Sequence, residues 1–174
     1  MNELGAHYLG DVQRHFQSLK NLADDAIAQA ESDFFTALGD EDNSIAVIVK
    51  HISGNMRSRW RDFLTSDGEK AERDRDREFI VQESKEDLLE AWERGWTTLF
   101  GALAGLGSHH LLQRITIRGE AHTVLEAVNR QLSHYAYHVG QIVLLAKHFC
   151  GAAWRSLSIP RGGSAAFNEA IDTL

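Results

Sequence analysis

The chain has 174 residues, 43% of them hydrophobic, which fits one globular domain covering residues 1–174. Its formal net charge of −7 argues against nucleic acid as a partner, because proteins that bind phosphates concentrate Lys and Arg. No apolar run is long enough to cross a bilayer, the N-terminus lacks the features of a secretory signal, and a lone Cys150 suits a reducing cytoplasm, where we expect the protein.

The first predicted helix runs from about Asn2 to Leu38. Its apolar residues recur at steps of three and four, the pattern of an amphipathic helix with one buried face: Leu9, Val12, Phe16, Leu19, Ala23 and Ile27. The turn-rich cluster GDEDNS ends it. A single proline in the whole chain leaves room for long helices of this kind.

A second helix is predicted to begin with Asn43 or Ser44 as its N-cap and to extend through SIAVIVKHISGNMRSRWRDFL. Its apolar face carries Ile45, Ile48, Ile52 and Met56. The charged stretch TSDGEKAERDRDREF follows. Its mixed signs favour a solvated loop over a binding patch.

A third helix opens at Ser84, where SKED matches the capping pattern, and continues through LLEAWERGWTTLFGALAGL to the glycines at 105 and 107. Trp92, Trp96 and Phe100 recur at helical spacing. Such a stripe is more typical of a core or a dimer interface than of a ligand pocket.

The next segment, LLQRITIRGE, is interpreted as a short extended pair or an irregular crossover. A fourth helix is predicted from about Glu120 to Phe149, and the tail after it as a loop packed back on the body. Four long helices around one core predict an all-α fold, a four-helix bundle.

Three of the nine histidines attract attention. His134 and His138 are four apart, hence stacked neighbours on the flank of the apolar face of the fourth helix, where they could share a metal ion. A third ligand must come from elsewhere, and His51 lies on the flank of the second helix, one turn before Asn55. The alternative is that all three are ordinary histidines at the edge of a core.

Several blocks of the sequence resemble the DinB/YfiT-like superfamily of bacterial four-helix bundles, within an uncharacterised branch. The blocks are VKHISGNMRSRWRDFLTSDGEK with RDREF behind it, ITIRGEAHTVLEAVNRQLSHYAYHVGQIVLLAKHF, and WRSLSIPRGGSAAFN. In that superfamily a histidine of the second helix and an H-x-x-x-H pair of the last form a metal triad. The resemblance therefore implies His51, His134 and His138 as the ligands.

Three imidazoles leave a coordination position for substrate, as catalytic zinc sites do, and they suit zinc, nickel or iron(II). Relatives in the superfamily include bacillithiol S-transferases and mycothiol-dependent isomerases. The resemblance thus implies a metal-dependent thiol transferase that uses a low-molecular-weight thiol on a small electrophile. Residues that could orient the substrate or support the ligands are Asn55, Tyr137, Gln141 and Arg161.

Two other functions are compatible with the same residues. The metal could stabilise a non-catalytic binding module, or it could serve a hydrolase, which needs a general base that the sequence does not supply. Cys150 stands alone and is not expected to be a nucleophile. Relatives often pair through bundle faces, so a homodimer is expected from the resemblance.

Overall fold

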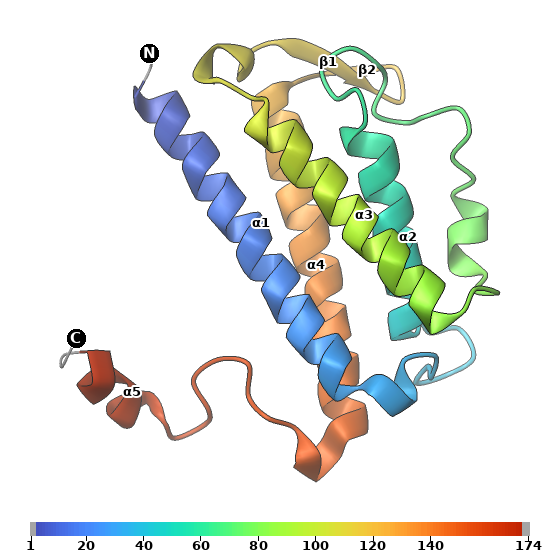
Figure 1. Ribbon diagram of the computed structural model, residues 1–174, viewed down its shortest axis with the longest axis vertical. Coiled ribbons are helices and arrows are strands. Elements are labelled where there is room, and N and C mark those ends of the chain that lie inside the picture. The colour runs from blue at the N-terminus through green and yellow to red at the C-terminus, as the bar shows by residue number, and fades with distance from the viewer. Residues whose placement is uncertain (1–2, 172–174) are drawn as a thin grey trace.

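A computed structural model describes residues 3–171 of the chain. Within these residues it has five α-helices and one two-stranded sheet: α1 (Glu3–Gln29), α2 (Ile45–Trp60), α3 (Lys85–Ala104), β1 (Arg114–Ile117), β2 (Glu120–Thr123), α4 (Val124–Cys150) and α5 (Ser164–Ile171). The four long helices lie side by side, which confirms the predicted all-α bundle (Figure 1). None of the described helices is long and apolar enough to cross a membrane.

The helices form two parallel pairs. The start of α1 contacts the start of α4, where the Tyr8 hydroxyl donates to Asn129 Oδ1, and their ends meet where Cys150 Sγ contacts the Gln29 carbonyl. The paired helices α2 and α3 run in the other direction, with Gly95 of α3 packed on Met56 of α2. Parallel neighbours cannot be joined by a tight turn, so a long crossover is required between them.

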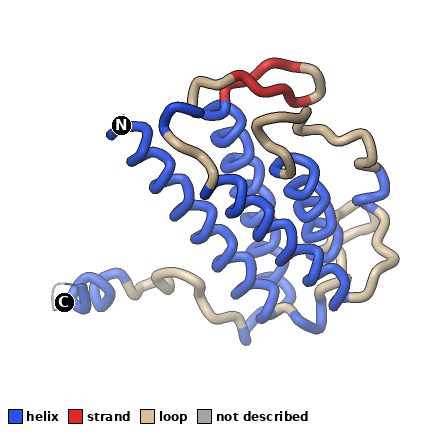
Figure 2. Tube along the Cα trace, turned by 45° about the horizontal axis from the view of Figure 1, so that its top comes forward, coloured by secondary structure: helices blue, strands red, loops and turns tan. Residues whose placement is uncertain are grey.

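The crossover comprises residues 61–84. It leaves α2 at the end of the bundle where the hairpin lies and returns along the outside of the bundle to the start of α3 (Figures 1 and 2). A short 3₁₀ helix, Asp76–Phe79, interrupts it. The crossover therefore passes beside α2 and places charged side chains next to the middle of that helix.

Two predicted helices end earlier than expected. α1 ends at Gln29 rather than Leu38; its last turn has no basic residue and acidic side chains follow it, an arrangement unfavourable to the helix dipole. α2 ends at Trp60 rather than Leu64, because Asp62 adopts a positive φ of 49° and Phe63 folds back onto the Trp60 ring. The starts are as predicted, with Ser44 and Ser84 capping α2 and α3.

The segment before the last long helix is an extended pair, the first of the two structures expected for it. β1 and β2 pair antiparallel around Arg118 and Gly119, both at positive φ. The fourth helix therefore begins at Val124, not near Glu120, which lies in β2. A capping box sets this start, because Thr123 and Glu126 exchange side-chain and backbone hydrogen bonds.

One hydrophobic cluster fills the bundle and includes the predicted faces of the first two helices, except that Leu19 is partly buried and packs against it. The side chains of Trp60, Trp92 and Trp96 are each only 1% exposed, so these aromatics belong to the core. Tyr135 is fully buried among them; its hydroxyl accepts a hydrogen bond from Trp60 Nε1 and donates one to Asn55 Oδ1. The core thereby fixes the side chain of Asn55, one turn after His51.

The prediction that the tail is a loop packed back on the body holds for its first part and is wrong for the rest. Trp154 and Leu157 pack against the bundle and Arg155 is hydrogen-bonded to Gln29, but the exposed chain beyond them runs away from it. It leads into the short helix α5, which stands clear of the bundle (Figure 1). Phe167 of α5 is 45% exposed, and the other described side chains of this helix are exposed as well, so it buries no apolar face against the body.

Candidate metal centre

Three histidines from two helices meet at one point. Nε2 of His134 lies 3.4 Å from Nε2 of His51 and 3.1 Å from Nε2 of His138. One ligand atom from each of the three lies within 4.8 Å of the others, and these residues could hold a metal ion. His51 is 5% exposed, and the other two are half-buried.

The spacing of these nitrogens fits a shared cation. Two ligands about 2.0–2.1 Å from a tetrahedral zinc ion stand roughly 3.3 Å from each other, and the two separations here are 3.1 and 3.4 Å. Neutral imidazoles whose unprotonated nitrogens face one another repel electrostatically. A positive ion between them removes that repulsion.

The hydrogen bonds of the Nδ1 atoms indicate that the Nε2 atoms of His51 and His138 are free to bind a metal ion. Nδ1 of His51 lies 2.9 Å from Glu78 Oε2, and Nδ1 of His138 lies 2.7 Å from Gln141 Oε1. Both oxygens are acceptors, so in the neutral rings the protons belong on Nδ1. The lone pairs of Nε2 then point toward the centre, as in metal sites whose histidines are held by an outer acceptor.

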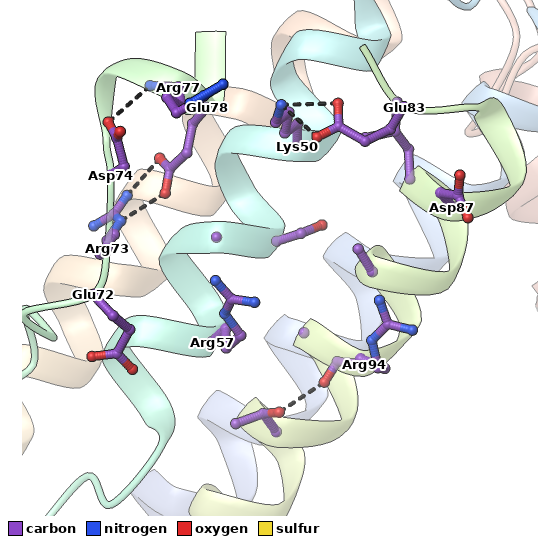
Figure 3. Close-up of a pocket in the computed structure, with 16 residues that line it drawn as sticks. Lys50, Arg57, Glu72, Arg73, Asp74, Arg77, Glu78, Glu83, Asp87 and Arg94 are labelled. Carbon is purple, nitrogen blue, oxygen red and sulfur yellow. Dashed lines mark hydrogen bonds and ion pairs between the residues drawn. The ribbon is translucent and has the colours of Figure 1, made fainter. Parts of the chain in front are cut away.

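Glu78 reaches His51 from the crossover and is fixed there by Arg73. The guanidinium of Arg73 donates to both carboxylate oxygens, at 2.7 and 2.8 Å (Figure 3). Arg73 and His51 outweigh the effect of burial and hold the pKa of Glu78 below its ordinary value. The side chains of both members of the pair are under 10% exposed, so the prediction of a solvated loop is wrong for these two residues.

A glycine makes room for this carboxylate. A Cβ atom at Gly54, one turn after His51 in α2, would lie 2.8 Å from Cδ of Glu78. Carbon atoms do not approach that closely without displacement. Gly54 therefore allows the crossover to pack directly on α2 beside His51.

Burial also keeps the imidazoles of His134 and His138 uncharged. Desolvation, with the nearby His138 and His51, lowers the pKa of His134 to about 3. Desolvation likewise lowers the pKa of His138 and outweighs the opposite effect of its hydrogen bond to Gln141 Oε1. Both rings are then neutral at neutral pH, the state in which imidazole binds metal ions.

Residues 3–163 match the family described as Protein of unknown function (DUF1572). The chain belongs to this family. No curated protein and no solved structure gave a significant match. The matched region contains all three histidines, the crossover and Gly54, whereas α5 lies beyond it.

The other candidate residues of this DUF1572 chain occupy three different settings. Asn55 is buried next to His51, held by Tyr135. Gln141 contacts His138, and its amide nitrogen donates to the hydroxyl of Tyr137, which is 63% exposed. Arg161 is exposed in the tail, which the structure does not bring to the histidines (Figure 1).

Sequence reasoning missed Glu78 and Arg73. They lie 27 and 22 positions after His51, in a loop without helical periodicity, so spacing could not connect them with the histidines. The only available signal was the block RDREF, which contains Glu78 and formed part of the family resemblance. The mixed charges of this stretch gave no indication that Arg73 and Glu78 form a buried ion pair.

Two of the larger cavities among the described residues are bordered by Arg73. One, of about 570 Å³, lies between α2, α3 and the crossover; it carries charges of both signs, among them Lys50, Arg57 and Glu83 (Figure 3). The other, of about 220 Å³, is bordered by His51 and His134 themselves. A small molecule in the second cavity would thus lie against the candidate metal centre.

Proposed function

We propose that this DUF1572 protein binds one divalent metal ion (zinc, nickel or iron(II)) through His51, His134 and His138, and that it is a metal-dependent thiol S-transferase. The observation that carries the metal assignment is the convergence of three Nε2 atoms beside a cavity. The resemblance of this triad to that of the DinB/YfiT-like superfamily, which includes thiol transferases, supports the reaction class.

The donor set suits such chemistry. A cation held by three neutral imidazoles keeps its full charge and would lower the pKa of a thiol bound beside it. In the transfer, sulfur bonds to the electrophilic carbon, the thiol proton passes to solvent, and any leaving group departs with its bonding electrons. Glu78 and Gln141 orient His51 and His138, and the cavity at His134 admits the small molecules.

The arrangement weighs against the hydrolase alternative. A hydrolase requires a general base near the attacking water. Glu78 is the carboxylate that contacts the histidine cluster, and both of its oxygens are engaged by Arg73 and one of them by His51 as well. Its pKa is held below the ordinary value, so it is a weak proton acceptor.

Elemental analysis of tag-free protein tests the metal assignment. We expect about one equivalent of zinc, nickel or iron per chain, lost in His51→Ala and retained in His15→Ala, which removes an exposed histidine of α1. No metal in the purified protein, and none taken up on titration, would refute the assignment.

The reaction class needs its own assay. Metal-loaded protein is incubated with chlorodinitrobenzene and, in turn, bacillithiol, mycothiol, glutathione or cysteine. We expect thiol-dependent product formation that stops on chelation and in His51→Ala. Stoichiometric metal without turnover on any thiol and several electrophiles would favour the non-catalytic binding module.

A further inference from the structure

The cavity beside the histidines is surrounded by positive charge. Among the described residues, its lining includes no acidic side chain and five arginines: Arg59, Arg73, Arg75, Arg118 and Arg130. The whole chain has 18 Lys and Arg and a net charge of −7, so this gathering runs against its overall charge. A cavity lined by one sign of charge concentrates ligands of the opposite sign.

The arginines are only partly neutralised by the protein. Arg73 is paired with Glu78 and Glu69. Glu69 is shared with Arg59 and Arg118, at 3.3 and 3.5 Å. Two carboxylates thus face three of the arginines. Arg75 lies over the Phe79 ring, and the side chain of Arg130 makes no hydrogen bond or ion pair with the described residues.

Arg59 supplies the second observation. It is 3% exposed, and its Nε and Nη1 atoms are buried with no hydrogen-bond partner in the part of the chain that the structure describes. An unsatisfied buried donor costs about 1–3 kcal/mol, and more on a charged group. Gly68 leaves the space in which this guanidinium lies, since a Cβ there would be 3.0 Å from Nη1. The Arg59 side chain is therefore fixed in position, and its Nε–H and Nη1–H groups remain available as hydrogen-bond donors.

Arg59 and Arg130 lie on the same rows of side chains as the histidines of α2 and α4. On α2, Asn55 and Arg59 follow His51 at successive steps of four; on α4, Arg130 precedes His134 by four. Residues at this spacing share a helix face. A ligand between these rows would reach the arginines with one end and the histidines with the other.

We propose that this cavity binds the oxyanion of a small substrate, a carboxylate or phosphate held by Arg59 and Arg130, so that the substrate of the candidate metal centre is an anion. Arg75 and Arg118 border the same site, while Arg73 serves mainly to hold Glu78. The inference rests on the proposed function for the reacting end of the ligand, and on the arginines alone for the anionic end.

Isothermal titration calorimetry on the protein as purified, at low ionic strength, tests this. The probes are succinate, inorganic phosphate and uncharged succinamide. We expect one of the two anions to bind, which identifies the oxyanion, and succinamide not to bind. In Arg130→Gln the affinity should fall roughly tenfold with unchanged metal content. Arg130 is exposed, so its loss leaves the core intact.

Arg57→Gln is the matched control. Arg57 is an exposed arginine of α2 that lines the other cavity, and its replacement should leave anion binding unchanged. The inference would be overturned if neither anion bound, or if both variants lost the same amount of anion affinity. It would also be overturned if Arg130→Gln left the anion affinity unchanged, which would place the anion on the metal. Anion binding that depends on Arg130 in a chain that takes up no metal supports the inference and refutes the proposed function.

Discussion

Glu78 and His51 stand 27 positions apart in the chain, yet the Glu78 carboxylate lies 2.9 Å from Nδ1 of His51. This contact joins the crossover to the second helix at the candidate metal centre. Arg73 donates a hydrogen bond to each oxygen of the same carboxylate, which fixes its orientation. The imidazole of His51 therefore contacts an acceptor that is itself held in place. The orientation of His51 thus depends on a loop as much as on its own helix.

Glu78→Gln should therefore weaken metal binding. The amide keeps the shape of the side chain but loses the charge that orients His51 and balances Arg73. Loss of such an outer partner lowers metal affinity about 10–100-fold, which competition with a chromogenic chelator measures. Glu83→Gln, which alters the Lys50 pair elsewhere in the crossover, is the control. Equal affinity in all three proteins would contradict this role for Glu78.

Gly54→Ala should have the same effect by steric means. The added methyl group would displace the Glu78 carboxylate, which cannot move without breaking its bonds to His51 and Arg73. We expect lower metal affinity and a lower free energy of unfolding. Gly101→Ala in α3 meets no atom within 4 Å and should instead stabilise the protein by about 0.5–1 kcal/mol. Urea denaturation compares the two variants.

Metal binding should raise the thermal stability of the protein. The three histidines come from two helices and meet only in the folded chain, so free zinc at 100 times its Kd should add about 2.7 kcal/mol. We expect the unfolding temperature to rise by about 5 °C or more. His138→Ala should abolish the rise, whereas exposed His148→Ala on the same helix should retain it. A rise of the same size in both variants would show that zinc acts elsewhere.

Asp67 should make stability depend on pH in acid. Burial raises its pKa, but backbone N–H groups of Glu69, Gly119 and Arg118 outweigh this and lower the pKa to about 2. An unfolded aspartate has a pKa of about 3.9. The stabilisation is therefore complete above about pH 4 and disappears as the pH falls toward 2.

Asp67→Asn tests this point. At pH 7 the variant should be less stable by about 1–3 kcal/mol, since charge-assisted hydrogen bonds to the hairpin are lost. The difference should shrink as denaturation is repeated down to pH 2.5. A difference that stays constant over this range would contradict the assigned pKa.

The sequence predicted what depends on helical periodicity. Leu9, Val12 and Phe16 share a buried face as their spacing indicates, and the four-residue step between His134 and His138 brings their Nε2 atoms toward each other. Periodicity would also have placed Arg130 one turn before His134, had the polar residues of the helix been considered together. Glu78 could not be found in this way, because its position depends on the path of a loop.

Helix ends were predicted less well for a related reason. The end of α1 at Gln29 depends on unfavourable charges at its C-terminus, and the end of α2 on the packing of Phe63 against Trp60. Both are tertiary or electrostatic effects that an apolar pattern does not contain. The start of α4, by contrast, had a local signal in Thr123 and Glu126 that was available in the sequence.

The pairing of α1 with α4 and of α2 with α3 also bears on how the chain folds. The hydrogen bond between Tyr8 and Asn129 spans 121 positions, and that between Cys150 and Gln29 spans the same number. Such long separations raise the contact order above that of a bundle built from consecutive helical hairpins, and folding slows as contact order rises. During synthesis α1 is made long before α4, the helix on which it packs. Its apolar face is exposed during that time, which makes it the part of the nascent chain most dependent on protection from aggregation.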